Sequence, residues 1–133
     1  MYKLSKRSRS RLDGIKPILI DIVEEAIKES PYDFGIPSFG GLRTAEEQHY
    51  LFNKGVSKCD GYEKLSNHQA KEGAEFSEAF DIYAYVNGKA TWKHEFYKPI
   101  ADHIKKIAKE KFDIELQWGG DWKSFVDLPH FQI

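Results

Sequence analysis

Two histidines and one aspartate have the side chains and the sequence contexts expected of metal ligands. His68 lies in a polar segment, whereas His130 follows Pro129, which fixes an extended approach to the apolar stretch HFQI. Asp81 lies in the run AFDIYAY, where a carboxylate is costly unless it is hydrogen-bonded or binds a cation. Two imidazoles and one carboxylate can form a catalytic zinc site, and a single cysteine, Cys59, excludes a thiolate cluster. His68, Asp81 and His130 are therefore our candidate zinc ligands.

Asp127 stands three residues before His130 in DLPHFQI and is our candidate general base. A carboxylate beside a zinc-activated water accepts its proton and later donates that proton to the leaving amine. A base and a ligand on the same turn would stay close together. The spacing D-x-x-H also occurs where an aspartate only caps a turn before a proline, so this motif alone leaves both interpretations open.

Amphipathic patterns predict three helices that must support these residues. Apolar residues recur at helical spacing over 15–30 and over 96–112. Thr44 and Glu47 form a capping box for a helix over 44–55. We interpret the three remaining histidines as structural residues of these helices or their edges, namely His49, His94 and His103.

The β-prone segments are short and lie between the helices. Asn87-Gly88 separates two β-prone runs, which predicts a hairpin within 79–92. Residues 56–77 have no clear period and are interpreted as a long loop. Further strands are expected within 34–42, 114–118 and 130–133. Helices mixed with antiparallel strands indicate an α+β fold, with a small antiparallel sheet and packed helices.

Length and charge set limits on the class of protein. A chain of 133 residues suggests one domain, 1–133, and its formal net charge of −1 gives no general attraction to nucleic acid or to anionic membranes. The N-terminal stretch MYKLSKRSRSRL has no apolar signal core, and no stretch is long enough to span a bilayer. We therefore expect no nucleic-acid partner, no signal peptide and no membrane insertion.

The ordered set of motifs resembles the zinc peptidases of bacterial cell walls. This group includes phage L-alanyl-D-glutamate endopeptidases and the vancomycin-resistance D,D-dipeptidases and carboxypeptidases, and the chain looks most like the short phage endolysins. The similarity runs through SRSRLDGIKPIL, SPYDFGI, GLRTAEEQHYLFNKG, SNH, AFDIYAYVNGKATW, WGGDW and DLPHFQI. The resemblance implies the same α+β fold of the zinc D,D-peptidase type.

The resemblance also assigns roles around the first two ligands. The family pattern S-x-H-x-x-G-x-A-x-D is matched at its start by Ser66 and His68 and at its end by Asp81. The spacing is longer here, because residues 69–78 contain an insertion. Two readings follow: Asp81 ligates and the loop bulges, which we favour, or Glu75, at the usual family spacing, takes its place.

Further cleft residues follow from the same comparison of motifs. Arg43 in GLRT matches the family arginine that holds a substrate carboxylate or the developing oxyanion. Gln48 and Ser66 are weaker candidates for substrate contacts. The block WGGDW supplies candidate cleft-lining residues that are equally compatible with a core position, namely Trp118, Asp121 and Trp122.

The expected function is that of a zinc-dependent endolysin. The resemblance implies a monomeric peptidase that hydrolyses a bond of the peptidoglycan stem peptide, with L-alanyl-D-glutamate favoured. Such a protein is made in the host cytoplasm and acts at the cell wall after a separate protein permeabilises the membrane. Two alternatives stay open at this point: a D,D-carboxypeptidase or dipeptidase with the same zinc chemistry, and a non-catalytic wall-binding module.

Overall fold

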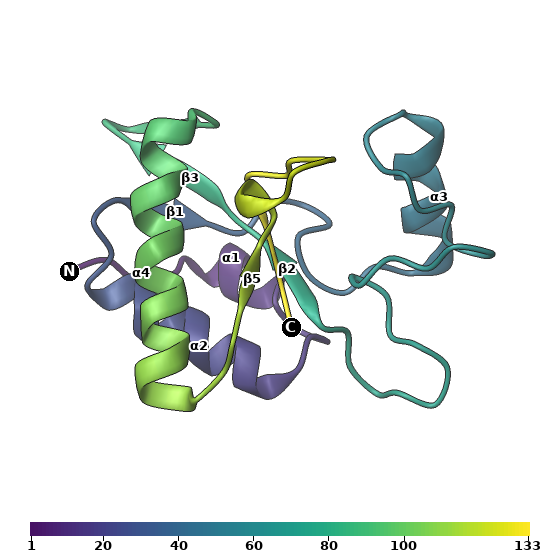
Figure 1. Cartoon of the computed structure of the whole chain (residues 1–133), viewed down its shortest axis with the longest axis horizontal. Helices are drawn as coiled ribbons and strands as arrows, with labels where there is room; N and C mark the ends of the chain where they lie inside the picture. The colour runs from purple at the N-terminus through teal and green to yellow at the C-terminus, as the bar shows by residue number, and fades with distance from the viewer.

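Two long helices pack against each other in the computed structural model, which describes residues 1–133 (Figure 1). Helix α2 spans Pro17–Lys28 and helix α4 spans His94–Phe112. Both bury one apolar face in a single hydrophobic cluster that also includes residues of the strands. Pro17 occupies the start of α2, where its missing N–H leaves no helical hydrogen bond unmade. The two amphipathic helices predicted from the sequence are therefore confirmed.

A separate short helix precedes α2. Helix α1 spans Lys6–Ser10, and the chain then turns through Gly14, whose φ of 98° is in the left-handed region. Ile15 pairs with Ser77 in an isolated parallel bridge before α2 begins. Ile15 is thus part of the core but not part of the helix, because the backbone on either side of it, at Gly14 and Lys16, forms hydrogen bonds to Ser77 at the end of the long loop.

The strands form two antiparallel sheets of three strands each. One sheet has the order β1-β3-β4, with β1 at Asp33–Gly35, β3 at Tyr83–Val86 and β4 at Lys89–Thr91. The other has the order β2-β6-β5, with β2 at Ala79–Asp81, β6 at His130–Gln132 and β5 at Gln117–Trp118. The α+β class is confirmed, and the strands are divided between two small sheets.

The chain passes from one sheet to the other at Ile82. Strands β2 and β3 flank this residue, and its N–H donates to the carbonyl of Pro129 at 3.0 Å. Asn87, with φ 54°, and Gly88, with φ 77°, form the turn between β3 and β4, so the predicted hairpin is confirmed there. The β-prone run that precedes Asn87 therefore belongs to two sheets, and its change of sheet sets Asp81 at the end of β2.

Helix α3 lies apart from α2 and α4, on the other side of the strands (Figure 1). It spans Ala45–Asn53, and the predicted capping box between Thr44 and Glu47 is present. The chain between α3 and β2 is irregular, as predicted, and a short 3-10 helix, η1, spans Gly119–Asp121 before β6. None of the helices combines the length and the apolar character needed to cross a membrane.

Candidate active site

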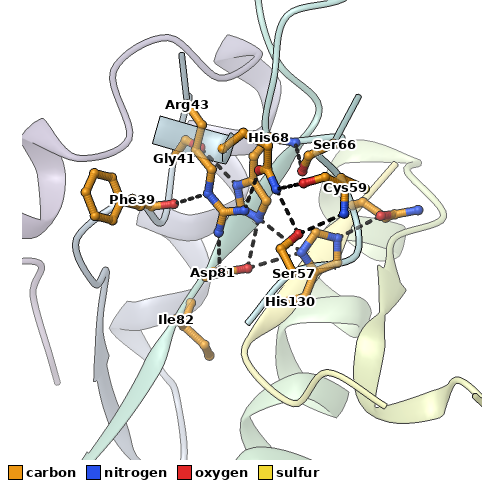
Figure 2. Close-up of polar contacts among 12 residues, drawn as sticks. Phe39, Gly41, Arg43, Ser57, Cys59, Ser66, His68, Asp81, Ile82 and His130 are labelled. Carbon is orange, nitrogen blue, oxygen red and sulfur yellow. Dashed lines mark hydrogen bonds and ion pairs between the residues drawn. The ribbon is translucent and has the colours of Figure 1, made fainter. Parts of the chain in front are cut away.

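His68, Asp81 and His130 converge on one point although they come from distant parts of the chain (Figure 2). The Oδ1 atom of Asp81 lies 3.0 Å from Nε2 of His68 and 3.1 Å from Nδ1 of His130. The two histidine nitrogens are 3.1 Å apart. Both imidazoles are buried. The structure thus brings together the three residues that the sequence analysis selected as metal ligands.

The segment that precedes α3 holds His68 in place. The carbonyl of Gly41 accepts a hydrogen bond from Nδ1 of His68 at 2.9 Å, and the backbone N–H of Arg43 donates to the His68 carbonyl at 2.8 Å. Because a carbonyl oxygen only accepts, Nδ1 of His68 carries the proton and the lone pair of Nε2 points at Asp81. A side chain at Gly41 would overlap the Arg11 carbonyl oxygen, so glycine is required for this close approach.

Gln132 of β6 and Trp122 of the preceding loop hold His130 in place. Its Nε2 lies 2.7 Å from Oε1 of Gln132, two residues along the same face of the strand, so Nε2 donates the proton. The lone pair of Nδ1 then points at Asp81. The ring of Trp122 also packs near this imidazole, with ring centroids 5.4 Å apart. Both histidines therefore direct their free nitrogen toward the same carboxylate oxygen.

Arg43 holds the second oxygen of Asp81. Its Nη2 donates to Oδ2 of Asp81 at 3.2 Å, its Nη1 donates to Oε1 of Gln48 at 3.0 Å, and its Nε donates to the carbonyl of Phe39 at 2.8 Å (Figure 2). The guanidinium group is mostly buried and is fixed on three sides. Arg43 therefore orients the carboxylate, and one N–H on each terminal nitrogen has no partner among these contacts.

Three acceptor atoms facing one another require a cation between them. Burial alone would raise the pKa of Asp81, but the adjacent His68 and His130 imidazoles hold that pKa well below its usual range. Burial would likewise lower the pKa of His130, but in the protonated imidazole the hydrogen bond to Asp81 and the charge of Asp81 together outweigh burial and raise that pKa. A proton shared in this group is thus favourable, and a metal ion bound by the same lone pairs would replace it.

The donor set and its spacing fit zinc. Tetrahedral coordination with Zn–N and Zn–O bonds of about 2.0–2.2 Å places the ligand atoms roughly 3.3 Å apart. The three observed separations of 3.0, 3.1 and 3.1 Å are only slightly shorter. Three protein ligands leave one coordination position for solvent or substrate, as in catalytic zinc sites. His68, Asp81 and His130 could therefore hold zinc with little rearrangement.

Asp127 lies at the edge of the same site. Asp127 is exposed to solvent, yet the atoms around its carboxylate and the negative charge of Asp81 raise its pKa above the ordinary value for aspartate. Its backbone N–H donates to Gly119 at 3.0 Å, and its carbonyl accepts from the N–H of His130 at 3.2 Å. A Cβ at Gly119 would overlap the Asp127 carbonyl oxygen, so this glycine allows η1 to approach the segment that carries Asp127.

The three candidate ligands, the candidate base Asp127 and Arg43 all line one cleft of about 690 Å³. The segment 55–59 and the loop 122–127 contribute to its walls. The walls combine apolar and basic side chains, and the residues outside the candidate set include Phe39, Leu51, Val56, Lys58, Lys64, Trp122, Phe125 and Val126. A cleft of this size with a dense polar centre can hold a few residues of an extended peptide.

The two weaker substrate candidates of the sequence analysis have internal partners. Gln48 is fully buried and bridges Arg43 to residues 57 and 59, with Nε2 donating to Ser57 Oγ at 2.7 Å and to the Cys59 carbonyl at 2.9 Å. Ser66 is also buried, and its Oγ accepts from the backbone N–H of His68 at 3.1 Å. In the structure both side chains position other residues of the site.

The fold places the remaining sequence candidates, those of the WGGDW block and Glu75, in different environments. Trp118 is buried in the core and donates to the carbonyl of Leu128 at 2.7 Å, whereas Trp122 lines the cleft. Asp121 pairs with Lys105 at 2.6 Å and is not part of the cleft. Glu75, the alternative ligand, is exposed in the long loop and is not among the clustered metal-binding groups.

Two supporting residues were not selected from the sequence. Gly41 orients His68 through its carbonyl, and Gln132 orients His130 through its amide oxygen. The glycine pair in FGGL and the alternation H-x-Q in the last strand were the available signals. Such partners fix the tautomer and the direction of a metal-binding imidazole.

Known proteins match this chain over most of its length. A family model described as phage L-alanyl-D-glutamate peptidase matches residues 1–131. The L-alanyl-D-glutamate peptidase of Escherichia phage T5 is 30% identical over 127 residues, which cover 95% of this chain and 85% of the phage protein. Peptidoglycan L-alanyl-D-glutamate endopeptidase CwlK of Bacillus subtilis strain 168 is 28% identical over 108 residues, 70% of this chain and 57% of CwlK.

A solved structure has the same fold. The crystal structure of the L-Ala D-Glu endopeptidase ChiX of Serratia marcescens superposes with a TM-score of 0.78 at 28% sequence identity. The match covers 99% of this chain and 90% of the ChiX chain. The resemblance inferred from the sequence motifs is thereby confirmed.

Proposed function

We propose that this chain, which belongs to the phage L-alanyl-D-glutamate peptidase family, is a zinc-dependent endopeptidase of bacterial peptidoglycan. The bond hydrolysed is the one between L-alanine and D-glutamate in the stem peptide. The observation that carries this proposal is the convergence of His68, Asp81 and His130 on one point in a cleft that also contains Asp127. All of these residues come from a single chain, which supports action as a monomer.

His68, Asp81 and His130 would hold the zinc ion, each through the atom that already faces the others. Zinc in such a site supplies a Lewis acid, which polarises a carbonyl group and lowers the pKa of a water molecule to about 7. Gly41 and Gln132 keep the imidazole protons outward, so that the lone pairs remain available. Arg43 keeps the Asp81 carboxylate turned toward the two histidines.

Asp127 is the proton carrier of the proposed reaction. Its carboxylate accepts a proton from the water that attacks the alanine carbonyl carbon. The same carboxyl group then donates this proton to the glutamate nitrogen as the C–N bond breaks, which yields a carboxyl group and a free amine. Arg43 lines the cleft and keeps one unpartnered N–H on each terminal nitrogen, and these groups could stabilise negative charge that develops on the carbonyl oxygen.

We further propose that the protein acts on the host wall after it leaves the cytoplasm, as expected of a phage endolysin. Purified muropeptides incubated with the protein and separated by mass spectrometry test the reaction itself. The proposal predicts a new free alanine carboxyl group on the glycan-linked fragment and a new glutamate amine on the other fragment. Release of D-alanine with the alanyl-glutamate bond intact would contradict it.

A further inference from the structure

We infer that Lys58 forms a carboxylate-binding subsite in the cleft, on the amine side of the bond that is cut. This inference rests on the proposed function and adds to it a residue that selects the substrate. The ligand group is the free carboxylate of the glutamate residue whose nitrogen is released.

The chemistry of the substrate requires such a carboxylate. In an alanyl-glutamate bond the glutamate nitrogen is acylated, and the residue retains two carboxyl groups. Only one of them can continue the main chain of the stem peptide, so the other is free unless it is modified. A negative charge therefore lies within one residue of the scissile bond, and a cleft that binds this peptide gains from a cation at the matching place.

Lys58 belongs to the segment 55–59, which forms part of the cleft wall. It lines the same cleft as His130 and Asp127, and its Nζ is 4.6 Å from the centroid of the Phe125 ring. Phe125 belongs to the loop 122–127, which also carries Asp127. The contact between a cation and this ring directs the ammonium group toward the wall that carries the proposed base.

The backbone on both sides of Lys58 is fixed. The buried amide of Gln48 donates to Oγ of Ser57 at 2.7 Å and to the carbonyl of Cys59 at 2.9 Å, and the Cys59 N–H donates to Ser57 Oγ at 3.2 Å (Figure 2). The same Gln48 accepts from Arg43. One buried side chain thus fixes the backbone around Lys58 relative to the candidate metal site, which lowers the entropic cost of binding an anion there.

The Lys58 ammonium is available for an external anion. It forms none of the ion pairs within the protein. Arg43, by contrast, is bound to Asp81, and Lys64, the third basic residue of the cleft, has no ring contact that directs its head group. Lys58 is therefore the basic side chain whose position best suits recognition of a substrate carboxylate.

A pair of synthetic stem peptides tests this inference. One contains L-alanyl-D-glutamate with the free carboxylate, and the other has the same carboxylate converted to the primary amide. The wild-type protein should cleave the acid with a higher kcat/KM than the amide, by about twofold to fivefold for one exposed charge pair. Lys58→Gln should remove this preference by lowering kcat/KM for the acid alone, and Lys58→Arg should retain it.

Lys54→Gln is the matched control, because Lys54 also lies over an aromatic ring, that of Tyr50, but outside the cleft. It should leave the preference unchanged. If the wild type cleaves both peptides equally well, or if Lys58→Gln keeps the preference, the subsite is refuted while the endopeptidase function stands. If the wild type cleaves neither peptide, the proposed function itself fails, and the subsite with it.

Discussion

Asp81 and His130 lie directly opposite each other in the antiparallel pair of β2 and β6. Side chains at such positions lie on the same face of the sheet, with Cβ atoms about 5 Å apart. This pairing, and not closeness in sequence, sets Oδ1 of Asp81 at 3.1 Å from Nδ1 of His130. The last strand therefore completes the candidate site by its register.

The register predicts which acid binds the metal. Asp81→Asn should lower the zinc content of the purified protein strongly, because the amide keeps the shape of the side chain but loses its charge. Glu75→Gln should leave zinc content unchanged, since Glu75 is exposed and outside the cluster. Elemental analysis of both variants beside the wild type decides the assignment, and the reverse pattern would make Glu75 the ligand.

Asp127→Asn should separate metal binding from catalysis. The variant keeps the three proposed ligands but has no carboxylate to carry the proton. We expect normal zinc content and a kcat lower by about 10²–10⁴-fold, the usual effect of a positioned general acid or base. Steady-state hydrolysis of a muropeptide, with zinc measured on the same sample, provides the test. Full activity would show that another group moves the proton.

Gly119→Ala should displace Asp127 by direct overlap, although the two residues are not neighbours in the sequence. The new Cβ would overlap the Asp127 carbonyl oxygen, so the loop that carries the base must shift. We expect a stability loss of about 1–3 kcal/mol together with a fall in kcat. Thermal denaturation and hydrolysis rates should be compared with those of Gly88→Ala.

Gly88 offers a matched control for that experiment. An alanine there meets no atom within 4 Å, but the φ of 77° makes it costly, by about 1–2 kcal/mol. The turn lies outside the cleft. Gly88→Ala should therefore lose stability and keep kcat. Equal loss of activity in both variants would mean that destabilisation, and not displacement of Asp127, is the cause.

Gln132→Leu should weaken zinc binding without removing a ligand. Its amide oxygen accepts the proton of His130 Nε2, and loss of such a partner costs about 10- to 100-fold in metal affinity. Competition with a chromogenic chelator measures the change. Gln117→Leu is the control, because the side chain of Gln117 makes a single hydrogen bond, accepted from the amide nitrogen of Gln132 at 3.4 Å, and this variant should bind zinc normally. Equal affinities in the two variants would argue against the role of Gln132.

Local patterns in the sequence accounted for the three longer helices, but not for α1, and for the candidate ligands. The stripes of α2 and α4, the capping box at Thr44 and the turn at Asn87-Gly88 each depend on residues close together in the chain. The candidate ligands could be selected because a carboxylate in an apolar run and a histidine after a proline are costly or constrained in themselves.

Other features depend on contacts between distant segments and could not be read from local patterns. The change of sheet at Ile82 is set by its hydrogen bond to Pro129, far along the chain. The hydrogen bonds between Gly41 and His68 and between Gln48 and Arg43 form only when the chain has folded. Gln48 and Ser66 were therefore selected as substrate contacts, whereas their observed partners are residues of the site itself.

The zinc content of the freshly purified protein tests the central claim most directly. Inductively coupled plasma mass spectrometry on wild type and on His68→Ala, purified side by side without added metal, gives the number of zinc ions per chain. The account predicts one zinc ion in the wild type and almost none in the variant. Equal zinc content in the two proteins would contradict it, because the ion would then be held somewhere other than at His68, Asp81 and His130.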